Sequence, residues 1–124
     1  MSETPIDRAH REQAADPDDP ARRLRLYERV LDAELLLVLA APPGEAEELS
    51  PLVLDLPEGP FVLAFDRDDR LADFLGEPAP FVALSGRRAV RLLAGRGTGL
   101  ALNLGAPSAT ILDPAALGWL AATA

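Results

Sequence analysis

Residues 61–102, FVLAFDRDDRLADFLGEPAPFVALSGRRAVRLLAGRGTGLAL, decide the fold. Short apolar runs alternate here with two amphipathic segments, which begin at the polar residues 66–69 and at Ser85-Gly86. Strand and helix therefore follow each other twice, a pattern that favours parallel strands joined by right-handed crossovers. We expect a sheet with helices packed against it.

The chain before this stretch predicts a helix and a buried strand. The segment DPDDP (16–20) supplies acidic caps and prolines, so a helix is expected from Ala21 to near Asp32. ELLLVLA (34–40) is a continuous apolar run, and it is too short for another buried helix. It therefore predicts a strand that is covered on both faces.

Two further stretches predict pairs of strands. PLVLDLPEGPFVLAF (51–65) has two apolar runs around a tight Pro-Glu-Gly-Pro turn, which indicates an antiparallel hairpin. TGLALNLGAPSATIL (98–112) has two runs around Asn103-Leu104-Gly105. Since Asn and Gly both tolerate positive φ, a turn explains this segment without a functional role. APPGEAEEL (41–49) is expected to be a loop.

The last helix is expected to start at Asp113-Pro114. It carries Leu117, Trp119 and Leu120, and we expect Trp119 and Leu120 to face the core. If this helix docks loosely, the same two side chains would instead form a contact between two copies of the chain.

These elements predict one α/β domain, at the border with α+β. It has a mixed sheet of five or six strands, helices packed on the sheet, and antiparallel hairpins on its flanks. Residues 1–16 are polar and aperiodic, so they predict a flexible acidic tail, and the domain itself is expected over 17–124.

Composition excludes several classes of function. The 124 residues include neither Cys nor Lys, which removes disulfides, thiolate chemistry, Schiff bases and the lysine of a phosphate-binding P-loop. The one histidine, His10, falls in the expected tail. The net charge of −8 disfavours binding to nucleic acid or an anionic membrane. Without a secretory signal or a long apolar run, a cytoplasmic protein is expected. No cofactor is expected either.

The acidic cluster Asp66-Arg67-Asp68-Asp69, with Asp73 nearby, admits two interpretations. Carboxylates are ligands for divalent metals, although the cluster lacks the glycine and glutamate spacing of a calcium loop. The alternative is N-capping, with acidic side chains at the positive end of a helix dipole. We favour capping.

A second candidate site lies where the strand at 80–84 runs into the next helix. The start of a helix offers free N–H groups to an anion or an acidic partner, and arginine side chains nearby would add to the attraction. A capping serine and a solvated helix face are the simpler interpretations. The candidate residues are Ser85, Gly86, Arg87, Arg88 and Arg91, with Arg96 extending the basic patch.

The ordered blocks of this chain resemble the N-terminal domain of the bacterial SseB family. The similarity lies in LYERVLDAELLLVL (26–39), FVLAFDRDDRLADF (61–74) and LSGRRAVRLLAGRGTGLALNLGAPS (84–108). Family members often have Asn-Pro-Gly in the turn, where this chain has Leu104. The resemblance implies an association with enhanced serine sensitivity and supplies no catalytic residues. The type III secretion label of some members has no support in these residues.

Three hypotheses for function follow. The first is a non-enzymatic module that binds an unknown protein partner or a second copy of itself. The second is a sensor of a small ligand or anion at the Ser85 helix start. The third and weakest is a metal-dependent enzyme that uses Asp66–Asp69.

Overall fold

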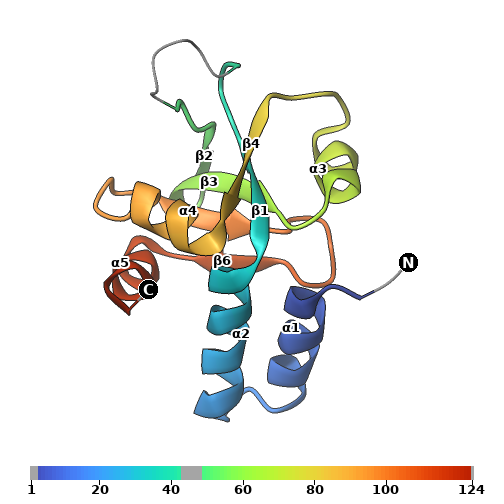
Figure 1. Cartoon of the computed structure of the whole chain (residues 1–124), viewed down its shortest axis with the longest axis vertical. Helices are drawn as coiled ribbons and strands as arrows, with labels where there is room; N and C mark the ends of the chain where they lie inside the picture. Colours follow the sequence, from blue (N-terminus) through green and yellow to red (C-terminus); the bar gives the residue numbers. More distant parts are fainter. Residues whose placement is uncertain (1–2, 43–48, 124) are drawn as a thin grey trace.

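The computed structural model describes residues 3–42 and 49–123. Most of the loop predicted at 41–49 lies outside these residues. Within them the chain forms five helices and six strands (Figure 1). The helices are α1 (Pro5–Ala15), α2 (Pro20–Asp32), α3 (Asp68–Leu75), α4 (Gly86–Leu93) and α5 (Pro114–Thr123). The strands are β1 (Glu34–Val38), β2 (Val53–Leu56), β3 (Gly59–Phe65), β4 (Phe81–Ser85), β5 (Gly99–Leu102) and β6 (Thr110–Leu112).

The strands form one mixed sheet in the order β4-β1-β3-β5-β6, and β2 pairs with β3 as the second strand of a hairpin. β3 and β5 pair in parallel, as the alternation of strand and helix predicts. β4 runs in the same direction, but β1 lies between it and β3 and is antiparallel to both. The predicted fold class, a mixed sheet with helices packed on it, is confirmed.

The inserted strand β1 is the one that the sequence predicts to be covered on both faces. Leu35, Leu37 and Val38 are all fully buried. A strand with apolar side chains on both faces is most stable inside a sheet. This explains why β4 pairs with the second edge of β1, which leaves β1 between β3 and β4.

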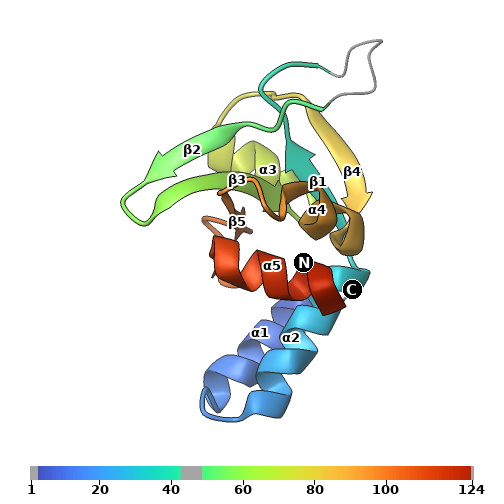
Figure 2. The ribbon, with the colours of Figure 1, turned by 90° about the vertical axis from the view of Figure 1, so that its left-hand side faces the viewer.

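Helices cover the two faces of the sheet unequally. α2, α4 and α5 pack on one face, over side chains such as Leu37, Ala64 and Leu102 (Figure 2). α3 covers the other face, where Leu71 packs with Leu63. The polar side chains described below lie at the end of the sheet where the parallel strands β3 and β5 both finish.

The first helix departs from the predicted flexible tail. Thr4 and Asp7 form a capping box, in which each side chain accepts a hydrogen bond from the other residue's backbone N–H. Pro5 occupies the first turn, and Ile6 is fully buried in the same core cluster as Leu26 of α2. Buried apolar side chains and a strong cap therefore hold residues 5–15 as a helix, antiparallel to α2 (Figure 1).

The cap of α2 and the last helix are as predicted, with one exception. Asp19 caps α2, and Asp113 accepts a hydrogen bond from the N–H of Ala116 at the start of α5. Leu120 is buried, but Trp119 is 49% exposed, so the expectation that Trp119 faces the core is wrong. In the described residues, no helix has the length and apolar character needed to cross a membrane.

Candidate functional site

Polar side chains from three separate segments meet at one end of the sheet. They come from the start of α1, from the junction of β3 with α3, and from the turn that follows β5. We call this group the polar junction, and its members are Thr4, Asp7, Asp66, Arg70, Asn103 and Ser108.

Arg70 is the charged centre of the polar junction. Its guanidinium donates to both carboxylate oxygens of Asp7, at 2.8 and 2.6 Å, and to Oδ1 of Asp66 at 2.8 Å. The hydroxyl of Thr4 donates to the other oxygen of Asp66 at 2.6 Å. The Asp66 side chain is only 4% exposed, so these bonds satisfy a carboxylate that is removed from water.

Asn103 ties the turn after β5 to the same group. Its φ of 56° confirms the predicted turn geometry, and its side chain is completely buried. Oδ1 accepts from the N–H of Asp66 at 3.0 Å, and Nδ2 donates to Ser108 Oγ at 3.1 Å. Ser108 donates in turn to Asp7 at 2.6 Å. Asn103 therefore joins two distant segments and is more than a turn residue.

The polar junction favours the ionised form of Asp7. Burial raises the pKa of the Asp7 carboxyl, but hydrogen bonds from Arg70, Ser108 and the Thr4 N–H outweigh burial and hold this pKa well below its usual range. The hydrogen bond to Asp7 raises the pKa of Arg70 above its already high value. Ionised acids that are already hydrogen-bonded are poor general bases.

His10 lines a hollow beside the polar junction, together with Asp7 and Ser108. These three residue types make a hydrolytic triad when the histidine accepts the serine proton. Here the Ser108 hydroxyl donates directly to Asp7, and its oxygen accepts from Asn103. The arrangement does not activate the serine, and it serves to hold α1 against the sheet.

A second feature is a groove between α2 and α5. Leu24 and Tyr27 of α2 face Trp119 of α5, and the rings of Tyr27 and Trp119 lie 6.0 Å apart with their planes tilted by 56°. The groove has a volume of about 400 Å³. At its border Arg87 of α4 donates to Asp32 of α2 at 2.9 Å. We call it the α2–α5 groove.

A comparison with known protein families finds the SseB protein N-terminal domain over residues 7–119. The chain belongs to the SseB family. The match spans the sheet and all five helices in whole or in part, which confirms the resemblance of the ordered sequence blocks. No curated protein and no solved structure matches the chain.

The SseB domain uses the predicted Ser85 site to pack one helix on another. Ser85 caps α4, with its Oγ accepting from the N–H of Arg88 at 3.2 Å. The N–H of Gly86 donates to the carbonyl of Ala33 at 2.8 Å. A Cβ on Gly86 would lie 1.8 Å from the carbonyl oxygen of Val30, so α2 closes over this helix start. The anion site at Ser85 stays a prediction, and the N–H groups of Gly86 and Arg88 at this helix start are already hydrogen-bonded.

The arginines of α4 are only partly available to a partner. Arg87 is paired with Asp32, while Arg88 and Arg91 lie on the exposed face of the helix with Arg87. The structure thus brings Arg87 to the α2–α5 groove and leaves Arg88 and Arg91 beside it on α4.

The predicted acidic cluster is divided in the SseB domain. Asp66 belongs to the polar junction, whereas Asp69 pairs with Arg67 at 2.9 Å. Arg67 is the N-cap of α3 and no side chain caps the helix, so the expected capping is wrong. Asp68 and Asp69 do lie in the first turn, as expected for acidic side chains at the positive end of the helix dipole. Among residues 3–42 and 49–123, no three acidic or histidine side chains meet as metal ligands.

Sequence reasoning missed the polar junction of the SseB domain. A partial signal was present in Thr4-Pro5-Ile6-Asp7, which is a capping box with proline at the first helical position. The pairing of Asp7 with Arg70 has no local signal, because the two residues are 63 positions apart.

Proposed function

We propose that this SseB domain is a non-enzymatic interaction module that pairs with a second copy of itself through the α2–α5 groove. The observation that carries the proposal is the shared exposure of Leu24 and Trp119, at 48% and 49%, on opposite walls of one groove. Scattered exposed apolar residues are ordinary, but a cluster that includes Trp and Tyr is typical of interface hot spots.

The charges around the groove support a second copy as the occupant. Glu28 lies exposed on the α2 wall and Arg88 lies exposed on the neighbouring α4, whereas Asp32 and Arg87 already pair with each other within one chain. A twofold axis presents the same patch on both partners. Acidic and basic walls on one patch can then face each other across the axis, and this pairing favours a defined orientation.

The chemistry of the chain supports recognition over catalysis. The chain has no thiol and no primary side-chain amine. The acids of the polar junction accept hydrogen bonds from Arg70 and Thr4. Proton transfer at the polar junction would depend on groups that are already hydrogen-bonded. We also propose a cytoplasmic location, in keeping with a chain without cysteine.

Sedimentation velocity over a range of protein concentrations tests the proposal. We expect the wild-type chain to approach twice its mass of 13.2 kDa and Leu24→Glu to remain a monomer. Ile111→Glu is the matched control, since Ile111 is 45% exposed but lies on β6, away from the groove. A wild-type monomer at all concentrations, or equal behaviour of Leu24→Glu and Ile111→Glu, would remove the proposal.

A further inference from the structure

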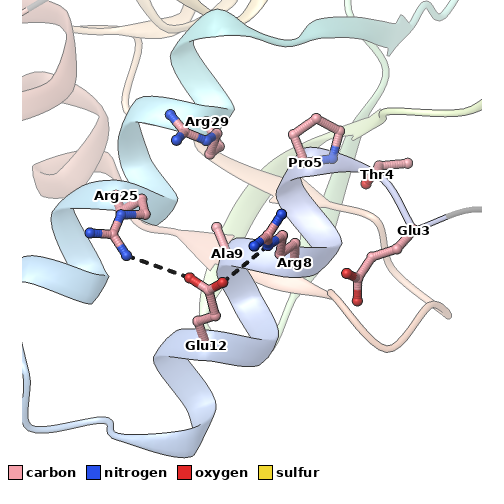
Figure 3. A pocket seen from close by; sticks show the side chains of 8 residues that line it. All are labelled: Glu3, Thr4, Pro5, Arg8, Ala9, Glu12, Arg25 and Arg29. Atoms are coloured by element: carbon pink, nitrogen blue, oxygen red, sulfur yellow. Dashed lines mark hydrogen bonds and ion pairs between the residues drawn. The ribbon is translucent and has the colours of Figure 1, made fainter.

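A hollow of about 540 Å³ lies between α1 and α2, and its lining shares no residue with the α2–α5 groove (Figure 3). Three arginines from the two helices line it: Arg8 from α1, and Arg25 and Arg29 from α2. The size falls within the range of pockets that hold small ligands. The three arginines make this part of the surface basic, whereas the chain as a whole has a net charge of −8.

One carboxylate balances these arginines only in part. Glu12 accepts from Arg8 at 3.2 Å and lies 3.5 Å from Arg25, and the hydrogen bond from Arg8 lowers the pKa of Glu12. Among the described residues, Arg29 has no ion pair. Figure 3 shows its guanidinium apart from the Arg8–Glu12–Arg25 group.

The second acid that lines the hollow is engaged elsewhere. Glu3 binds Arg11, which is not part of the lining, at 2.9 and 3.0 Å. Figure 3 shows Glu3 on the far side of α1 from Arg25 and Arg29. Within the hollow, three guanidinium charges therefore face the one carboxylate of Glu12, which leaves an excess of two positive charges.

We propose that this hollow binds a small phosphate monoester. At neutral pH such a group carries nearly two negative charges, which matches the excess, and it offers three oxygens to guanidinium donors that approach from two helices. Guanidinium groups pair with phosphate through charge-assisted, often bidentate hydrogen bonds. Arg29, which does not pair with Glu12, donates hydrogen bonds to the phosphate. The bound dianion then neutralises the two excess positive charges between α1 and α2.

The lining supports binding without turnover. The hydroxyl of Thr4 is the nucleophile type nearest to the site, and it donates to Asp66 of the polar junction. A small dianion also avoids the repulsion that a long nucleic acid would meet from the acidic remainder of the chain.

Thermal unfolding of the full chain with added salt tests this site. The probes are inorganic phosphate and glucose 6-phosphate, compared with sodium chloride at equal ionic strength, because phosphate stabilises most proteins through exclusion from their surfaces. We expect a saturable rise in Tm with both phosphates. Arg29→Gln should weaken the apparent affinity at least about tenfold, while Arg23→Gln, at an exposed arginine of α2 that does not line the hollow, should leave it unchanged.

Three outcomes would contradict a phosphate monoester site in this hollow. Equal Tm curves for wild type and Arg29→Gln would show salt exclusion only, and a non-saturable rise would show the same. Tighter binding of a single-stranded oligonucleotide that also depends on Arg29 would assign the hollow to a polyanion. If Arg29→Gln does not fold, Arg25→Gln replaces it in the same comparison.

Discussion

Arg70 holds Asp7 by both carboxylate oxygens, at 2.6 and 2.8 Å, across 63 positions of sequence. This pair fastens α1 to the start of α3, and Asp66 on the same guanidinium extends the link to the end of β3. Because the three side chains are largely removed from water, the loss of one leaves the others without partners.

Replacement of Arg70 should therefore destabilise the domain. We expect Arg70→Met, which keeps the apolar part of the side chain, to lower the free energy of unfolding by about 2 kcal/mol. Urea denaturation measures this change. Arg8→Met breaks an ion pair whose arginine is 71% exposed, so it should cost less than about 0.5 kcal/mol. Similar losses for the two variants would contradict the role of the polar junction.

The depressed pKa of Asp7 makes stability depend on pH in a defined direction. The unfolded chain takes up this proton near the ordinary value of 3.8, while the folded chain takes it up only at lower pH. The contribution of Asp7 is thus present above about pH 4 and is lost as the pH falls towards the folded pKa. Urea midpoints from about pH 6 to pH 3 should fall for wild type and converge with those of Asp7→Asn. Parallel curves would argue against this linkage.

Asn103 combines a backbone requirement with two hydrogen bonds, and two variants separate them. Asn103→Gly keeps the positive φ but leaves the Asp66 N–H without its acceptor, at a cost of about 1–3 kcal/mol. Asn103→Ala adds backbone strain and should be less stable than the glycine variant by about 1 kcal/mol. Thermal or urea unfolding of both proteins checks the order. A glycine variant as stable as wild type would mean that the side-chain bonds contribute nothing.

Gly86 lies where α4 packs under the end of α2. A Cβ there would lie 1.8 Å from the Val30 carbonyl oxygen, so Gly86→Ala should cost about 3 kcal/mol. Gly118→Ala in α5 is the matched control, because nothing lies within 4 Å of its Cβ position. That variant should gain about 0.5–1 kcal/mol from helix propensity. Circular dichroism melts of the two proteins would then shift in opposite directions.

The sequence predicts those parts of the fold that depend on neighbouring residues. Asp19 and Ser85 cap their helices as expected, and Asn103 adopts positive φ at the predicted turn. Each of these features is decided by a few adjacent side chains and backbone groups. The order of strands and helices from Pro20 onwards follows from the same local patterns.

Features that depend on tertiary position are the ones that the sequence does not predict. The polar tail contains Ile6 and Ala9, whose side chains become core residues only because α2 lies opposite. Trp119 is half exposed because it lies on the wall of the groove between α2 and α5, two helices that are far apart in the sequence. The polar junction joins Ser108 to Asp7 across 101 positions, and helical or strand periodicity carries no signal at that separation.

Trp119 is the only tryptophan in the chain, so its fluorescence tests the proposed pairing at the α2–α5 groove most directly. We predict that the emission maximum of the wild-type protein moves to shorter wavelength as concentration rises, because a second copy removes the half-exposed ring from water. Leu24→Glu should keep the emission of the dilute protein at every concentration. An emission maximum that stays constant in the wild type, from dilute to concentrated solution, would contradict self-association through this groove.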